Sequence, residues 1–197
     1  EKLVTMRSQA PDAYVFLGAI QERLGRPAEA AKAYQAALQR DRTHLPAGRA
    51  LASLHEREQR PAEAIRLLQD AAKAHPESVG VFLDLAQVYE RTGNAAAAVT
   101  AYREALQRDA NHPAVLNNLA YLLGREGKNL DEALALAERA YRRVPKNPAI
   151  ADTLGWLFYQ KGNTERAEQL LSAAAKAAPQ QAQIRFHLGL VYAKRGK

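Results

Sequence analysis

The sequence predicts an all-α protein made of stacked antiparallel helix pairs. Segments that begin at Leu17, Leu85 and Leu154 align with one another, and their small residues and turns recur at a period of 34 residues, as from Pro11 to Leu45. Within each period, large and small apolar residues return at the spacing of one helix face. One helix pair cannot bury its own apolar face, so neighbouring pairs are expected to supply the core.

Each period is expected to form one helix pair. The full units are residues 11–44, 45–78, 79–112, 113–147 and 148–181. Residues 182–197 begin a further unit and contain only its first helix, and residues 1–10 are interpreted as the remnant of a preceding helix. The sequence thus predicts a single array over residues 1–197, with partial units at both ends.

The first helix of each unit has a stripe at positions four, seven, eight and eleven, counted from the first residue of the unit. Position eight is small in every unit, and the residues there are Gly18, Ala52, Ala86, Ala120, Gly155 and Gly189. Glycine inside a helix costs about 1 kcal/mol relative to alanine. Gly155 therefore predicts a point where two helices cross too closely for a side chain.

The second helix of each unit is expected to begin with recognisable signals. Pro27 and Pro61 fit the first helical position, where the missing N–H of proline costs nothing. In the fourth unit, Glu132 follows Asn129 by three residues, which predicts a capping box.

These positions resemble the consensus of the tetratricopeptide repeat family over almost the whole chain. The resemblance implies a right-handed α-solenoid, or superhelix, whose first helices line a concave groove that binds a peptide, a helix or a partner subunit. The segments NNLAYLLGREGKNLDEALALAERA and ADTLGWLFYQKGN look like repeats of bacterial envelope proteins, some of them lipoproteins, linked to exopolysaccharide export and protein sorting. This likeness favours the bacterial periplasm or a membrane-anchored envelope protein, and leaves the cytoplasm open.

The groove is expected to hold the only tryptophan, Trp156, because position nine lies opposite the packed stripe. The candidate partner-binding residues are Asn117, Asn118, Tyr121, Asp152, Trp156, Tyr159, Phe186, His187, Arg91 and Arg125. Aromatic side chains with one wet and one dry side are favoured interface anchors. Paired asparagines can bond an extended backbone in both directions. Two interpretations stay open: the rings hold a partner, or they pack on one another or on further chain and bind nothing.

The first half of the groove carries glutamate at position twelve and arginine at position thirteen in successive units. The residues are Glu22, Arg23, Glu56, Arg57, Glu90 and Arg91. The pattern fits a ladder of ion pairs between repeats, or an electrostatic guide for a charged partner segment. Both interpretations stay open.

The sequence predicts no enzymatic activity, no cofactor and no metal site. It has no cysteine, no His-Glu ligand pair of the HExxH type and no glycine-rich phosphate loop. The formal charge of +7 comes from dispersed arginines, and the glutamate column would repel phosphate. The sequence therefore disfavours nucleic acid as a partner. RNA binding is kept as an alternative to protein binding, as is self-association through exposed ends of the array. No apolar run approaches the roughly 20 residues that cross a bilayer.

Overall fold

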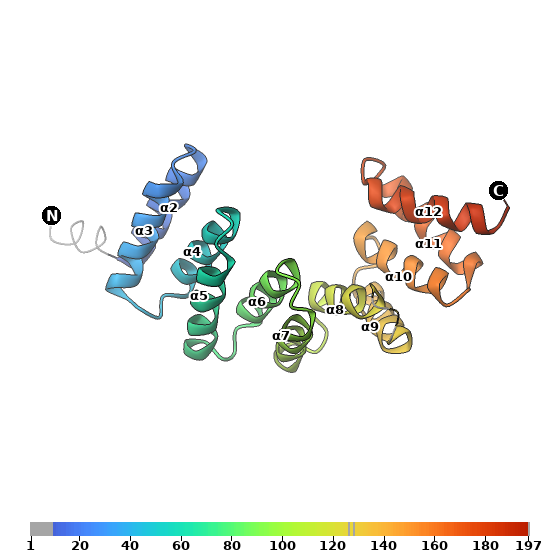
Figure 1. Cartoon of the computed structure of the whole chain (residues 1–197), viewed down its shortest axis with the longest axis horizontal. Coiled ribbons are helices and arrows are strands. Elements are labelled where there is room, and N and C mark those ends of the chain that lie inside the picture. Colours follow the sequence, from blue (N-terminus) through green and yellow to red (C-terminus); the bar gives the residue numbers. More distant parts are fainter. Residues whose placement is uncertain (1–9, 126, 128, 197) are drawn as a thin grey trace. The chain divides into compact units, whose positions relative to one another are not determined.

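The computed structural model describes residues 10–125, 127 and 129–196 (Figure 1). Its helices are α2 (Pro11–Arg23), α3 (Pro27–Arg40), α4 (Leu45–Arg57), α5 (Pro61–Ala74), α6 (Val79–Arg91), α7 (Ala95–Arg108), α8 (Pro113–Arg125), α9 (Leu130–Arg143), α10 (Pro148–Gln160), α11 (Thr164–Ala177) and α12 (Ala182–Lys194). No strand occurs in this described part, so the all-α prediction is confirmed. The remnant helix expected in residues 1–10 falls almost wholly on residues 1–9, which lie outside the described residues.

The chain divides into two compact units, which we call unit 1 and unit 2. Unit 1 extends to Ala101 and unit 2 begins at Tyr102, so the boundary falls inside α7. The single array expected from the sequence stays a prediction, and each unit is described by itself.

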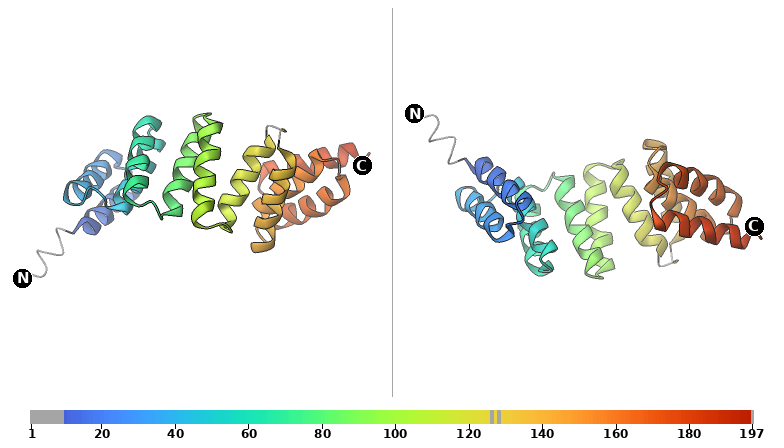
Figure 2. Two further views of the ribbon diagram at one scale, coloured as in Figure 1. Left: turned by 90° about the horizontal axis from the view of Figure 1, so that it is seen from below. Right: turned by 90° about the horizontal axis from the view of Figure 1, so that it is seen from above.

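Unit 1 contains the helix pairs α2–α3 and α4–α5, followed by α6, which packs on α5. The two helices of each pair run side by side in both views of Figure 2. A core cluster of Ala30, Tyr34, Leu51 and Leu54 joins the two pairs. Alanine on one side of this cluster leaves room for the tyrosine ring and the leucines on the other, which keeps the packing dense.

Unit 2 contains the pairs α8–α9 and α10–α11, and α12 packs on both α11 and α10. Two buried clusters connect α12 to the preceding pair. One comprises Ala151, Ala174 and Ile184, and the other Ala167, Leu171 and Val191. Each cluster draws side chains from two successive repeats, which is how repeat proteins build a continuous core.

Gly155 lies where α10 crosses α11. A Cβ atom added to it would lie 2.8 Å from Leu171 Cγ and 3.3 Å from Leu170 Cβ. The predicted close crossing is confirmed, and tight helix packing offsets the intrinsic cost of the glycine.

The helix starts agree with the sequence only in part. Pro27 and Pro61 are the first residues of α3 and α5, as predicted. The predicted capping box is wrong, because the Asn129 side chain makes no capping hydrogen bond. The backbone of Asn129, with a φ of −131° and a ψ of 47°, is outside the extended conformation usual for such a cap. Asn147 and Asn163 cap α10 and α11 instead, and each side chain accepts from backbone N–H groups of the first turn.

Candidate functional site

A buried pair of polar side chains connects α10 to α12 in unit 2. Asp152 and His187 are each only 6% exposed, and the imidazole Nδ1 lies 2.8 Å from Asp152 Oδ1. A carboxylate can only accept, so the ring donates to it. This bond fixes the orientation of the imidazole on the face of α12 that meets α10.

Trp156 stacks on two other rings beside this pair. Its ring centroid lies 4.4 Å from that of His187, with 14° between the planes, and 5.2 Å from that of Tyr159, with 20° between the planes. With its amide turned to suit both neighbours, Gln160 accepts from Trp156 Nε1 at 2.5 Å and donates to the Gly124 carbonyl at 3.0 Å. The indole is half-buried, and two stacking contacts and the hydrogen bond of its N–H hold it in place. We call Asp152, Trp156, Tyr159, Phe186 and His187 the ring cluster.

The exposed part of the ring cluster is Phe186. Its side chain is 64% exposed, and its ring lies tilted at 6.0 Å from that of His187. The Lys194 ammonium lies 5.0 Å from the centroid of the Tyr159 ring, a cation–π arrangement at the edge of the cluster. The cluster thus presents a large apolar side chain beside an ordered, partly covered set of rings.

The remaining candidates of unit 2 lie on α8, which packs against α10. Asn117 and Asn118 are half-buried, and Asn117 Nδ2 donates to Asn118 Oδ1 over 3.4 Å. Tyr121 is half-buried and Arg125 is exposed at the end of the helix. The structure therefore brings five of the predicted residues into one cluster and places these four on the neighbouring helix.

Arg91, the last candidate, belongs to unit 1, where it forms an ion pair with Glu56. Arg57 forms the equivalent pair with Glu22. The ladder interpretation is confirmed for these two pairs. Glu22 also accepts a 2.7 Å hydrogen bond from the Tyr34 hydroxyl, and burial together with this bond raises the pKa of Tyr34.

Each of these ion pairs should contribute little to stability. In a double-mutant cycle of Glu56→Ala and Arg91→Ala, we expect a coupling of about 0.5 kcal/mol, because the Arg91 side chain is 55% exposed. Urea denaturation at low and at high salt measures this coupling. Salt should reduce it further, and a coupling that is insensitive to salt would contradict the screened-pair explanation.

A second kind of pair between repeats was not predicted. Arg49 Nε lies 2.5 Å from Asp84 Oδ2, and the two residues are 35 positions apart, as are Asp152 and His187. In both pairs the side chain at position five of one repeat meets the side chain at position six of the next, and the carboxylate is at position six in the first pair and at position five in the second. The signal in the sequence was this separation of 35 residues, one more than the period. Complementary side chains at that separation could have revealed both pairs.

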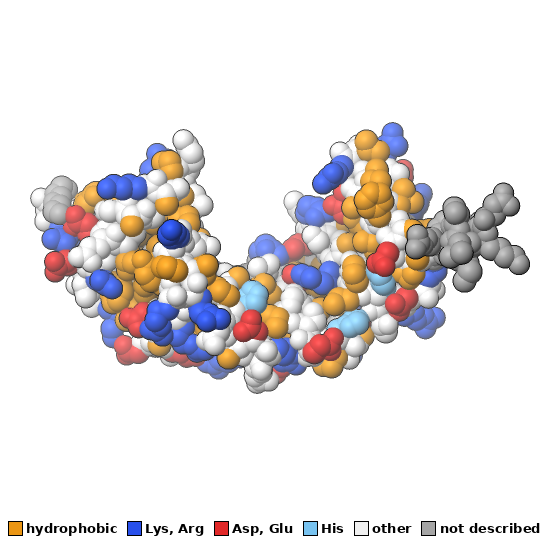
Figure 3. All heavy atoms as spheres, turned by 180° about the vertical axis from the view of Figure 1, so that it is seen from behind, with side chains coloured by type: hydrophobic (Ala, Val, Ile, Leu, Met, Phe, Trp, Pro, Cys, Tyr) orange, Lys and Arg blue, Asp and Glu red, His pale blue; other side chains and the backbone are white. Residues whose placement is uncertain are grey.

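A cavity of about 320 Å³ lies between α4 and α6 in unit 1. Its charged lining residues are already paired within the chain, Arg49 with Asp84 and Glu56 with Arg91. On the face drawn in Figure 3, acidic and basic side chains are interspersed within each unit. The cavity between α4 and α6, which are the first helices of two successive repeats, is called the first-helix cavity below. It therefore offers few unpaired charges to a ligand.

Among the described residues, no three His, Cys, Asp or Glu side chains come close enough to hold a metal ion. No helix in that part of the chain combines the length and the apolar character that spanning a bilayer requires.

Models of the family described as tetratricopeptide repeat match residues 11–44, 49–113, 83–148 and 124–187. Comparison with curated proteins gave no match. Solved structures similar to the chain include one of pilF from Pseudomonas aeruginosa, with 23% identity, 96% of this chain and 87% of that chain covered, and a TM-score of 0.80.

Two further similar structures are those of YrrB and MamA. YrrB, described as a TPR protein with an unusual peptide-binding site, has 20% identity, 98% and 96% of the two chains covered, and a TM-score of 0.70. MamA has 18% identity, 89% and 96% covered, and a TM-score of 0.72. At these identities the likeness shows the fold alone.

Proposed function

The chain belongs to the tetratricopeptide repeat family, and from this membership we propose that it is a non-enzymatic scaffold whose ring cluster binds a peptide or helix of a protein partner. The observation that carries the proposal is an exposed Phe186 beside rings that are already fixed in place. Scaffolds of stacked helices hold partners through side chains on exposed helix faces. The ring cluster is such a face on α10 and α12.

The ring cluster is suited to binding because little order has to be created when a partner arrives. The Asp152–His187 hydrogen bond and the stacking of Trp156 hold the rings before contact. Binding loses free energy when rotatable side chains are immobilised, about 0.5 to 1.5 kcal/mol for each. Rings that are already immobile avoid that cost.

The chemistry of Phe186 selects an apolar side chain on the partner. Phenylalanine offers area for burial and no hydrogen-bonding group, so its contribution must come from contact with apolar surface. An aromatic or branched apolar residue of the partner would cover Phe186 and the neighbouring ring edges. Such a contact has the form of an interface hot spot.

A role in assembling a bacterial envelope or export machine is our proposal for the process. It depends on the likeness of the segments NNLAYLLGREGKNLDEALALAERA and ADTLGWLFYQKGN to envelope proteins. A periplasmic or membrane-anchored location belongs to the same proposal. The identity of the captured partner tests both.

The test is affinity capture with this protein as bait, followed by mass spectrometry. We expect Phe186→Ala to weaken binding of the partner about thirtyfold, since truncation of a hot-spot aromatic costs about 2 kcal/mol. Phe16→Ala is the matched control, because Phe16 is 69% exposed and lies in unit 1. Equal capture by the two variants would place the binding site elsewhere.

A further inference from the structure

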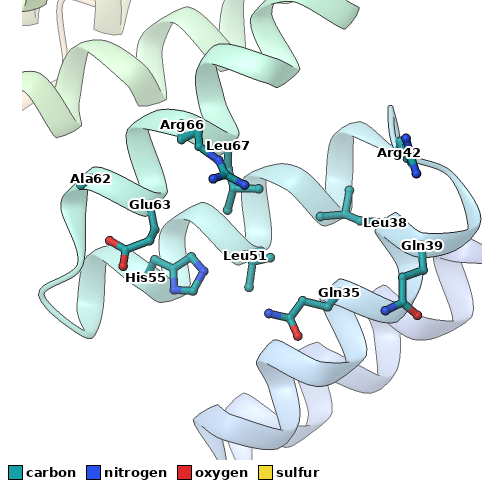
Figure 4. Close-up of a pocket in the computed structure, with 10 residues that line it drawn as sticks. All are labelled: Gln35, Leu38, Gln39, Arg42, Leu51, His55, Ala62, Glu63, Arg66 and Leu67. Atoms are coloured by element: carbon teal, nitrogen blue, oxygen red, sulfur yellow. The ribbon is translucent and has the colours of Figure 1, made fainter.

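A larger cavity of about 690 Å³ lies in unit 1 between α3 and α5, and residues of α4 also line it (Figure 4). We call it the α3–α5 cavity. Its lining residues on α4, Leu51 and His55, differ from the residues of that helix that line the first-helix cavity, such as Ser53 and Glu56. The two cavities therefore use different faces of α4, and the α3–α5 cavity is a separate surface from the ring cluster.

The floor of the α3–α5 cavity is apolar. Leu51 is 3% exposed and belongs to the core cluster of unit 1, against which the half-buried Leu38 and Leu67 also pack. One leucine comes from each of the three helices around the cavity. A ligand that reaches the floor thus meets the hydrophobic core itself, where burial is worth about 25 cal/mol per Å² of apolar area.

The wall contains a histidine, His55, whose imidazole makes no hydrogen bond to the described residues. His55 is 7% exposed, and neither ring nitrogen bonds to another described residue. Its Nδ1 is buried and lies 3.9 Å from Glu58 Oε2, too far for a hydrogen bond. Burial, and after it the nearby Arg60, lower the pKa of His55, which keeps the imidazole neutral. A buried polar group without a partner is uncommon in folded proteins.

The rim carries charges that no other described residue neutralises. Arg42 and Arg66 make no ion pair or hydrogen bond within the part of the chain that the structure describes, whereas Arg49 is held by Asp84. In Figure 4 the guanidinium of Arg66, the amide of Gln35 and the imidazole of His55 are turned toward the space between α3 and α5. Two arginines against one glutamate, Glu63, leave the rim with a positive balance.

We propose that the α3–α5 cavity binds an amphipathic helix of a protein partner, with leucine-type side chains on one face and acidic residues beside them. Leucine-type side chains of the partner would cover the floor of Leu38, Leu51 and Leu67. Its carboxylates would pair with Arg42 and Arg66, because planar guanidinium groups form bidentate hydrogen bonds with carboxylates. Both walls are helices, whose backbone groups are already bonded internally. An added strand would find no backbone partner there, so the occupant must bind through side chains, as a helix in a groove does.

The probe is a fluorescent synthetic peptide that places leucines three and four residues apart along one helix face, with glutamates flanking them. Anisotropy measures its binding to the whole chain. We expect Arg42→Glu with Arg66→Glu to weaken binding at least about tenfold, or about 1.4 kcal/mol, since both charge-assisted bonds are lost and like charges then face the glutamates of the peptide. Arg142→Glu with Arg143→Glu is the matched control, because these exposed residues of α9 give the same change in net charge in unit 2.

A photo-reactive residue at Gln39, on the rim, should crosslink to the same peptide. A peptide with lysines in place of the glutamates should bind more weakly than the acidic peptide. The proposal is overturned by absence of binding, by equal weakening in both double variants, or by displacement of the peptide by dodecanoate at concentrations below those that the unlabelled peptide needs. The last result would identify a small anionic amphiphile as the occupant.

Discussion

We expect Gly18→Ala to lower the free energy of unfolding by about 2 kcal/mol. The new Cβ would lie 2.3 Å from Tyr34 Cε1, closer than two carbon atoms that are not bonded to each other can approach. The Tyr34 ring has little room to retreat, because it is 2% exposed and its hydroxyl donates to Glu22. Displacing it costs more than the roughly 1 kcal/mol that alanine gains over glycine in a helix. Urea denaturation followed by far-ultraviolet circular dichroism measures the change.

Gly189→Ala is the control for this prediction. Gly189 has the same position in its repeat as Gly18, but no described atom lies within 4 Å of where its Cβ would be, apart from its own helix and chain neighbours. The same substitution should therefore raise the free energy of unfolding, by up to about 1 kcal/mol. If Gly18→Ala also raised the free energy of unfolding, helix propensity and not close packing would govern this position.

The second large effect is expected for His187→Ala, which should lower the free energy of unfolding by about 3 kcal/mol. Asp152 is only 6% exposed in the intact protein, and the substitution removes the imidazole from which its carboxylate accepts a hydrogen bond. It also removes the ring that stacks on Trp156. Urea denaturation measures the loss, and the emission of the only tryptophan reports whether its surroundings have opened to water.

Asp152→Ala and the double variant with His187→Ala complete a thermodynamic cycle. Once one partner is absent, removing the other also removes an unpaired buried group, so the double variant should be more stable than the sum of the single effects predicts. We expect a coupling of about 1.5 kcal/mol, within the range for side chains in direct contact. Additive losses would mean that the 2.8 Å contact contributes no interaction of its own.

The helices were predictable because their signals are local. Pro27 and Pro61 begin helices as their lack of an N–H suggests, and Gly155 lies at a close helix crossing. The capping box at Asn129 failed because a cap depends on backbone angles as well as on residue types. A sequence pattern gives only the residue types.

The candidate site was predictable in composition but not in arrangement. Trp156 was expected to face a groove, and the structure gives it two stacked neighbours and a bonded N–H. Arg91 was expected as a binding residue and forms an ion pair with Glu56. The position of His55 in the wall of the α3–α5 cavity became visible only in three dimensions.

The sequence by itself determined the helices, their order and the small residues that let them cross, since helix formation and turn chemistry act over a few neighbouring residues. Only the tertiary structure decided which side chains of successive repeats meet. Position five meets position six in Arg49–Asp84 and Asp152–His187, because that match depends on how far one helix is shifted against the next. The α3–α5 cavity likewise depends on the distance between two helices that are not neighbours in sequence. Complementary residues 35 positions apart indicate which pairs are possible, but the spacing of the helices decides which pairs and which empty volumes form.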